Sequence, residues 1–419
     1  MASRRPDPVF GDSLRPRIDR MSSWTARAAA AGALLATGSA IAAGRTSDVQ
    51  QHGAAPIAAT GRDRAGDAVP PRPTTAVVGE EAPVPGNVNG AAMVMPAWET
   101  GKIGAVAPTA APDVVGAFRF ICTPGQLSYD DPIVFPRQPG RSHLHQFFGN
   151  TLADAGSTYD SLRRTGDSTC MNPLNRSAYW IPAMLTGQGQ VVRPDYVTIY
   201  YKRLPQTSSD CRRDSGRCAP VPRGLRFVFG FDMVTGKPAT GSGYFICDNN
   251  ALRDGHWPTI AEAAPACPSG ARLGAVINAP NCWDGKRLDS PNHRDHVAYQ
   301  SYGNWGYPRC PSSHPVLIPT FTLGAWYKTD DSLRRDGTPS WHLSSDEMPG
   351  MTAAPGSTLH ADWFGAWDDA TLETWTAHCI DRMLSCSGGD LGNGTQLRQV
   401  APFSWDAKPR LVPMPQRPN

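Results

Sequence analysis

Short stretches rich in β-branched and aromatic residues, some with alternating apolar and polar positions, recur along the chain after residue 115. Each stretch is bounded by Pro, Gly or Asn, which favour turns. They predict strands at residues 116–122, 196–202, 224–230, 271–278 and 316–327. Pro319 lacks an amide proton, so it places the last of these strands at a sheet edge or a bulge.

Helical spacing of apolar residues is rare in this chain. Residues 158–164 predict one short helix. Residues 368–380 predict another, because Leu372, Trp375 and Cys379 follow an acidic start at helical spacing. Many short strands with few helices predict a mainly β fold, a single β-sandwich-like domain with long loops.

Residues 1–43 have the pattern of a secretory signal peptide or an N-terminal anchor. A basic region precedes an uncharged, Ala-rich run at residues 28–43, which is shorter than the roughly 20 residues that a spanning helix needs. Ala40-Ile41-Ala42 fits a signal-peptidase site. Met21 is an alternative start to Met1. We therefore expect a secreted or extracellular protein, with attachment to the cell surface as the alternative.

Residues 44–113 contain no cysteine and show no periodicity. Such a composition buries too little apolar surface to order itself, so it predicts a disordered Pro/Ala/Gly-rich linker. The alternative is a poorly patterned strand or two at the domain edge. The folded domain is then expected at residues 114–405, followed by a C-terminal tail at residues 406–419. The 41 glycines and 40 prolines of the chain fit a loop-rich domain.

Ten cysteines, all after residue 120, support the prediction of export. No Cys-x-x-Cys motif occurs, so a zinc knuckle or a thioredoxin-like site is not indicated. In an oxidising environment up to five disulfides are expected. Proximity favours Cys211–Cys218 and Cys379–Cys386, while the remaining connectivity does not follow from the sequence.

The net charge of +3 and the absence of a long basic run give no support for binding to nucleic acid. No stretch beyond the N-terminal one is long and apolar enough to cross a membrane. We expect a monomer without contact to a membrane other than through that possible anchor.

His143 and His145 form the most informative feature of the chain. On an extended strand, residues two apart point to the same face, so both rings can reach one pocket. A second pair of this type, His360 with Asp362, lies far down the chain and is also followed by aromatic residues. The two pairs predict one composite site.

Five runs of sequence carry a resemblance to a known family. They are residues 131–150, 172–182, 282–299, 310–315 and 360–368. In this order they resemble the domain-of-unknown-function family numbered nineteen ninety-six. The resemblance implies a secreted domain with a loose association with cell walls and polysaccharides. It implies no catalytic residues.

The site residues predicted from chemistry lie within these runs. His143, His145 and His360, with Asp362, are a reasonable ligand set for one divalent metal ion. Without a metal, the same histidines act as acid or base while the carboxylate holds a tautomer. Further catalytic candidates are Asp284, His293 and His296. The structural alternative is a set of histidines bonded to backbone carbonyls, with Asp284 in an Asx-turn.

Aromatic and polar residues near the same motifs predict the binding of a sugar. Flat rings stack on sugar faces, although core packing explains each ring equally well. The substrate-binding candidates are Arg141, Asn150, Tyr179, Trp180, Trp283, Trp363 and Trp367. Hydrolysis of a glycoside needs two carboxylates, whereas a lyase favours His143 with Tyr179 or Tyr299.

The function predicted from the sequence is action on, or binding of, a polysaccharide or cell-wall glycan. Glycoside hydrolase and polysaccharide lyase chemistry both stay open. The alternative is a non-catalytic exported module with a structural, adhesive or stress-sensing role.

Overall fold

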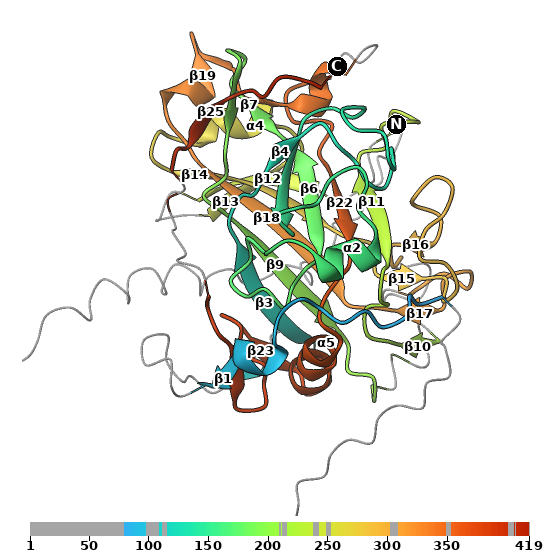
Figure 1. Cartoon of the computed structure of the whole chain (residues 1–419). Helices are drawn as coiled ribbons and strands as arrows, with labels where there is room; N and C mark the ends of the chain where they lie inside the picture. The colour runs from blue at the N-terminus through green and yellow to red at the C-terminus, as the bar shows by residue number, and fades with distance from the viewer. Residues whose placement is uncertain are drawn as a thin grey trace, which may run out of the picture. The chain divides into compact units, whose positions relative to one another are not determined.

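Two antiparallel-rich sheets pack face to face and build the main core (Figure 1). The structure is a computed structural model that describes residues 79–97, 109–110, 115–208, 211, 216–237, 243–248, 253–301, 309–348, 353–400, 406 and 408–418. These residues belong to one compact unit, Ala76–Asn419.

The larger sheet has eight strands and supplies one layer of the core. Its strands, in spatial order, are β13 (Arg253–Trp257), β12 (Gly243–Asp248), β14 (Arg272–Asn278), β18 (Thr320–Lys328), β9 (Tyr196–Arg203), β3 (Gly116–Cys122), β23 (Leu384–Cys386) and β2 (Thr109–Ala110). All neighbours are antiparallel except β23 and β3.

The second sheet has five antiparallel strands. Its order is β11 (Arg226–Gly230), β22 (His360–Phe364), β6 (Ala178–Pro182), β5 (His145–Gly149) and β4 (Leu127–Ser128). Figure 1 shows β22 between β11 and β6. Every residue of the three central strands is buried, because both faces of the sheet are covered.

Smaller sheets surround these two layers. One contains β10 (Arg217–Cys218), β17 (Val316–Leu317), β15 (Cys282–Trp283) and β16 (Val297–Ala298), and another contains β21 (His342–Leu343), β7 (Met184–Leu185), β8 (Gln190–Val192) and β25 (Leu411–Pro413). Two-stranded sheets pair β1 (Val94–Pro96) with β24 (Thr395–Leu397) and β19 (Arg334–Arg335) with β20 (Thr338–Pro339).

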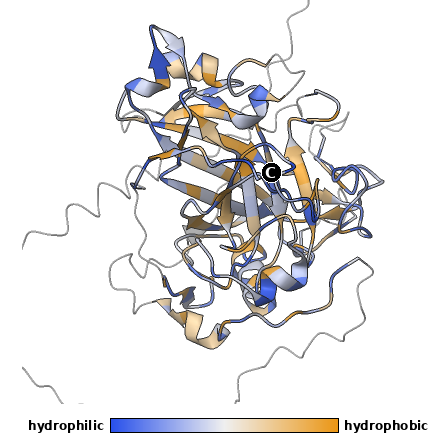
Figure 2. Cartoon of the chain, turned by 45° about the horizontal axis from the view of Figure 1, so that its top comes forward, coloured by the Kyte–Doolittle hydropathy of each residue, from blue (hydrophilic) through white to orange (hydrophobic). Residues whose placement is uncertain are grey.

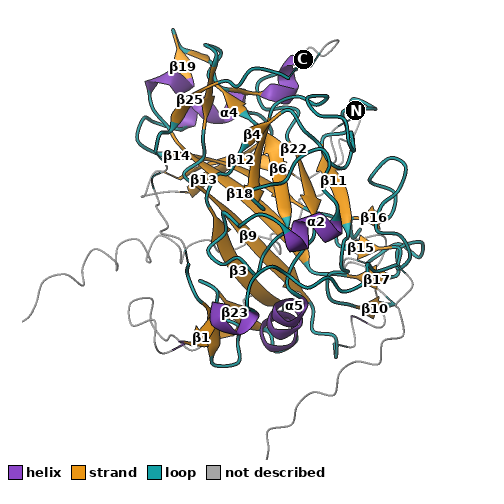
Figure 3. Ribbon diagram, in the orientation of Figure 1, coloured by secondary structure: helices purple, strands orange, loops and turns teal. Residues whose placement is uncertain are grey.

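The described helices are short (Figure 3). They are α2 (Tyr159–Arg164), α4 (Ile260–Ala263), α5 (Asp369–Trp375), the π-helix η8 (Thr376–Ile380), and the 3-10 turns η2 (Gly90–Met93), η5 (Ala264–Ala266), η6 (Asp331–Leu333) and η7 (Ser344–Glu347). Thr158 caps α2 in a reciprocal pair of bonds with Ser161. Among the described residues, no helix combines the length and the apolar character that crossing a membrane requires.

The two faces of the five-stranded sheet have different neighbours. Phe148, Tyr179 and Trp363 face the eight-stranded sheet and join its core cluster, which forms the apolar centre in Figure 2. Phe147 and Trp180 face the other way and pack with Tyr159 and Leu162 of α2. This second face is therefore covered by a helix and loops rather than by a sheet.

The predicted fold class is confirmed. The predicted strand at residues 116–122 matches β3, and the prediction at residues 316–327 is divided into β17 and β18 around Pro319. The predicted helix at residues 368–380 starts as α5 and continues as η8.

The predicted signal peptide or anchor lies outside the described residues. Within the predicted linker, β1 pairs with β24, and Arg223 donates to the Glu81 carbonyl at 2.9 Å. Of the described residues 79–97, only Val94–Pro96 form a strand. Within the predicted C-terminal tail, β25 pairs with β8.

Five disulfides join all ten cysteines. The predicted bonds Cys211–Cys218 and Cys379–Cys386 are present. The other three are Cys122–Cys170, Cys247–Cys267 and Cys282–Cys310. Disulfides of this kind persist in oxidising environments.

Candidate functional site

Three histidine rings from distant parts of the chain meet on the second face of the five-stranded sheet. The Nε2 atoms of His143 and His360 lie 3.2 Å apart. The ring centroids of His143 and His145 lie 4.1 Å apart. One ring nitrogen from each of the three residues lies within 4.8 Å of the others. The structure thus brings together the three histidines that the sequence predicts as metal ligands.

The register of the sheet explains this convergence. His145 begins β5 and is paired with Pro182 of β6, while Asp362 of β22 is paired with Trp180 of the same strand. Side chains two residues apart on a strand share a face, so His360 lies on the side of Asp362. His143 lies in the loop just before β5, with its ring 4.1 Å from that of His145.

Two of the three rings donate their Nδ1 proton to a backbone carbonyl. The Nδ1 of His145 lies 3.0 Å from the Asp130 oxygen, and the Nδ1 of His360 lies 2.8 Å from the Thr358 oxygen. A carbonyl oxygen only accepts, so each Nδ1 carries the hydrogen. In the neutral ring, Nε2 is then left with a free lone pair.

The third ring, that of His143, also donates its Nδ1 proton, in this case to the Ser344 hydroxyl. The Ser344 hydroxyl donates to the Leu144 carbonyl at 2.5 Å, so its only proton is already used. His143 Nδ1 lies 3.0 Å from this hydroxyl oxygen and therefore donates to it. His143 Nε2 is left as an acceptor as well. Three Nε2 lone pairs are thus left unshared, and the Nε2 atoms of His143 and His360 are at hydrogen-bond distance with no proton between them.

Burial keeps the three rings neutral. It lowers the pKa of His145 to about 3 and the pKa of His360 to about 4. The pKa of His143 is also lowered well below its usual range, first by burial and then by the neighbouring rings. A neutral imidazole is the form that binds a metal ion.

Two carboxylates lie next to the rings. Asp362 is 1% exposed, and neither of its side-chain oxygens has a hydrogen-bond partner among the described residues. Asp131, Asp362 and His145 each offer one ligand atom within 4.8 Å of the others. Burial raises the pKa of Asp131 to about 6. Burial, followed by the charge of Asp131, raises the pKa of Asp362 well above its usual range.

The sequence analysis did not single out Asp131. It stands at the start of the run that contains His143, before a proline, where an aspartate normally indicates a turn. The turn is present, because Asp131 Oδ1 accepts from the amides of Ile133 and Val134 at 2.9 and 2.8 Å. Only its position twelve residues before His143, within the same run, pointed to the site.

The C-terminal residues cover the loop that carries His143. The Tyr129 hydroxyl donates to the Pro415 carbonyl at 3.1 Å, and Arg417 donates to the Ser142 carbonyl at 2.9 Å. The Arg417 guanidinium also lies 4.8 Å from the centre of the Tyr129 ring. The three histidines are between 0% and 7% exposed. The centre is closed in this structure.

The other catalytic candidates have local partners of their own. The His296 ring bonds to Ser290 and to the Arg226 carbonyl, and His293 pairs with Asp289 at 2.8 Å. Asp284 accepts from the amides at positions 286 and 287, which is the predicted Asx-turn, and pairs with Arg287. The structure does not bring these three residues into the histidine cluster.

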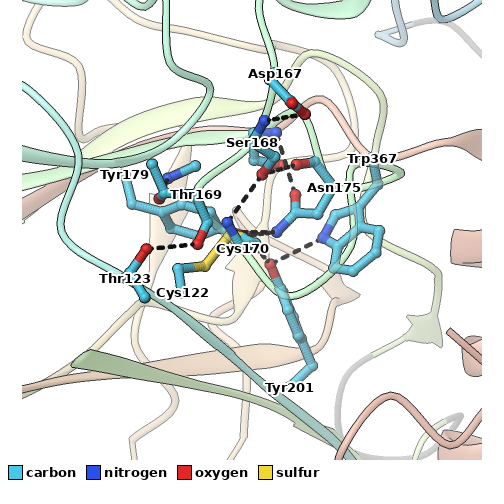
Figure 4. Close-up of a disulfide and its surroundings, with 12 residues drawn as sticks. Cys122, Thr123, Asp167, Ser168, Thr169, Cys170, Asn175, Tyr179, Tyr201 and Trp367 are labelled. Carbon is cyan, nitrogen blue, oxygen red and sulfur yellow. Dashed lines mark hydrogen bonds between the residues drawn. A yellow bond between two sulfur atoms is a disulfide. The ribbon is translucent and has the colours of Figure 1, made fainter. Parts of the chain in front are cut away.

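The aromatic candidates lie inside the core. Trp180, Trp283, Trp363 and Trp367 are at most 3% exposed. Tyr179 and Trp367 are also engaged with Tyr201, beside the disulfide Cys122–Cys170 (Figure 4). The Tyr179 and Tyr201 hydroxyls lie 2.8 Å apart, and the Trp367 indole donates to the Tyr201 hydroxyl at 3.2 Å. In this conformation these rings are structural and offer no face to a sugar.

The two polar substrate-binding candidates also differ from each other. Asn150 is buried and donates to the Leu162 and Thr165 carbonyls, so it holds α2 against β5. Arg141 is exposed and lies over the Phe135 ring, at 5.9 Å from its centre. Of the predicted substrate-binding residues, Arg141 is the one that solvent reaches freely.

A model of one protein family matches residues 131–367, and its description is domain of unknown function (DUF1996). The match spans the histidine centre and both of its carboxylates. No curated protein and no solved structure matches the chain.

Proposed function

The chain belongs to this family, whose description assigns no activity, and we propose that it binds a divalent transition-metal ion through His143, His145 and His360. One observation carries the proposal. The Nδ1 atoms of the three rings donate to oxygen atoms of the protein. The three Nε2 lone pairs are left unshared in rings that lie together. Metal-binding histidines have this arrangement, with the second ring nitrogen held by a carbonyl or another acceptor.

The spacing of the nitrogens supports the same conclusion. Zn–N bonds of about 2.0–2.1 Å in a tetrahedral site place two ligand nitrogens about 3.3 Å apart. The Nε2 atoms of His143 and His360 lie 3.2 Å apart. Two unshared lone pairs at this distance repel each other, and a cation between them turns the repulsion into two bonds. Imidazole ligands suit Zn, Cu, Fe and Ni.

The closed position of the centre favours a structural role for the ion. Structural zinc sites are closed, whereas catalytic sites keep an open coordination position. Here the ligands join the loop before β5 to β22, with β6 between these strands. An ion at this place ties together parts of the sheet that are far apart in the sequence, and its binding energy adds to folding stability.

Action on a polysaccharide or cell-wall glycan, and export, stay predictions from the sequence. A metal centre supplies Lewis-acid chemistry for hydrolysis, and a glycan reaches the histidines only after the residues that cover them move. New reducing ends or unsaturated products from a panel of polysaccharides support the enzyme. Their absence with fully loaded protein supports the non-catalytic module.

Metal analysis of the full chain tests the proposal. The protein is produced with Zn²⁺ in the medium, desalted, and analysed for bound metals by mass spectrometry. We expect a single bound ion per chain. His143→Gln, His145→Gln and His360→Gln are expected to lose it, with an affinity loss beyond the about 10–100-fold that removal of an outer partner causes.

His296→Gln is the matched control, because His296 is equally buried and both of its ring nitrogens bond to the protein. This variant is expected to retain the ion. Circular dichroism shows whether each variant is folded. A folded wild-type chain that retains none of Zn, Cu, Fe, Ni or Mn overturns the proposal.

A further inference from the structure

We infer that Asp131 and Asp362 complete this centre as a carboxylate pair, so that one divalent ion is held by a mixed set of imidazole nitrogens and carboxylate oxygens. The inference rests on the proposed metal binding and extends it. It adds a residue that the sequence did not indicate, and it assigns both buried carboxylates one shared purpose.

His145 connects the carboxylates to the imidazoles. Its ring belongs to the group with His143 and His360 and also to the group with Asp131 and Asp362. Its Nδ1 donates to the Asp130 carbonyl, so Nε2 is the nitrogen that keeps a lone pair for a metal ion. An imidazole nitrogen binds one ion at a time. One ion beside His145 Nε2 is therefore the arrangement in which both groups take part.

Asp362 has both carboxylate oxygens available for such an ion. Both oxygens of Asp362, and the Nε2 of His145, are buried without a hydrogen-bond partner among the described residues. Buried polar groups are normally paired, so each unpaired group in this position calls for an explanation. Asp131 Oδ1 accepts two amides, which fixes the direction of the carboxyl group. These three unpaired atoms belong to residues whose ligand atoms lie within 4.8 Å of one another, a grouping that suits a bound cation.

The charges give the second argument. Two ionised carboxylates buried side by side are strongly unfavourable unless a cation compensates them. Two described basic residues act on the pair, Arg294 on Asp362 and His293 on Asp131. Arg294 donates to the Gly230 and Phe231 carbonyls at 3.2 and 2.9 Å, and His293 is already paired with Asp289 at 2.8 Å. Three neutral imidazoles, two carboxylates and one divalent ion carry no net charge together. A charge-neutral centre is the form that suits a dry interior.

This composition narrows the choice of ion. Thiolates and thioethers select Cu(I), imidazole suits Zn, Cu, Fe and Ni, and carboxylates suit harder ions such as Mn. A set with both nitrogen and oxygen ligands fits a divalent ion of the Zn²⁺, Fe²⁺ or Mn²⁺ class. We therefore expect these ions to bind in preference to monovalent copper.

Two isosteric variants test the inference, Asp131→Asn and Asp362→Asn. Each removes a charge and leaves a side chain of the same shape. Zn²⁺ affinity is measured on the full chain by competition with a coloured chelator. We expect each variant to lose at least about 10-fold in affinity, within the range found for groups that support a metal.

Asp284→Asn is the matched control. Asp284 Oδ1 accepts the amides two and three residues ahead, which is the same pattern that Asp131 shows. It is expected to bind Zn²⁺ as the wild type does. If Asp131→Asn fails to fold, Asp362→Asn decides alone, because Asp362 has no hydrogen bond to lose among the described residues.

The possible results distinguish the carboxylate pair from the three-histidine site on which it depends. A wild type that binds Zn²⁺, with both asparagine variants binding equally tightly, overturns the carboxylate pair and leaves the imidazole site standing. Two Zn²⁺ ions per chain, reduced to a single ion by Asp362→Asn, overturn the shared single ion. A wild type that binds no ion overturns both.

Discussion

Gly230 of β11 is paired directly with His360 of β22, and a Cβ atom at Gly230 comes within 2.7 Å of the His360 Cα atom. Gly230 has a φ of +90°, a conformation that side chains rarely adopt. The strand that carries His360 is thus held close to β11 by the absence of a side chain.

Gly230→Ala is expected to lower both stability and metal affinity. The positive φ alone costs about 1–3 kcal/mol, and the contact with β22 displaces His360. Urea unfolding and Zn²⁺ titration measure the two effects. Gly189→Ala is the control, because Gly189 has a φ of +70° but no atom within 4 Å of its Cβ position. Unchanged Zn²⁺ affinity in Gly230→Ala contradicts the link between this pair and the centre.

Removal of the metal is expected to destabilise the protein. An ion that binds only the folded state stabilises it by about 4 kcal/mol when its free concentration is about 1,000 times the Kd. Urea midpoints with and without a chelator measure this difference. The urea midpoint of His145→Gln, which lacks the histidine shared by both ligand groups, should change with neither chelator nor Zn²⁺. Identical midpoints for the wild type under both conditions show that the ion contributes nothing to folding.

His296 is expected to make stability depend on pH. In the folded protein, burial lowers the pKa of His296 below the usual value of 6.5. As the pH falls below about 6.5, the His296 ring of the unfolded chain binds a proton while the same ring in the folded protein stays neutral. The free energy of unfolding therefore decreases as the pH drops. His296→Gln removes this contribution. The free-energy loss caused by the substitution should be larger at about pH 8 than at about pH 5.

Denaturant unfolding of both proteins across this range provides the measurement. The comparison isolates His296 from the other buried histidines, since these titrate equally in both proteins. A wild-type curve and a variant curve that run parallel at every pH contradict the expectation.

Arg417→Ala is expected to open the cover over His143. It removes the bond to the Ser142 carbonyl and the contact with the Tyr129 ring, at a stability loss of about 1 kcal/mol. A chelator should then extract the ion faster, with little change in equilibrium affinity. Arg164→Ala removes an exposed ion pair with Asp160 and is the control. Equal extraction rates for the two variants show that Arg417 has no part in closing the centre.

Local patterns in the sequence predicted part of the fold. The strand at residues 116–122 is indicated by its alternating sequence. Its burial in the structure also alternates in part. None of the predicted strands covers β5, β6 or β22, the three central strands of the five-stranded sheet. They are buried at every position, so they show no alternation and resemble any short apolar run.

The same limit applies to the centre. The spacing of His143 and His145 predicted a common face, because this depends only on strand geometry. The approach of Asp131 depends on a loop that folds back over the sheet, which no local pattern encodes. His293 and His296 have the right chemistry, but hydrogen bonds within their own loop and to β11 engage their rings, and neither ring belongs to the histidine cluster.

Residues 411–418 follow all three imidazoles and both carboxylates in the chain. A ribosome therefore releases this segment, which bonds to Tyr129 and Ser142 of the loop that carries His143, only after all five side chains. If the centre binds an ion as proposed, this order of synthesis would leave it within reach of a dissolved cation until β25 pairs with β8.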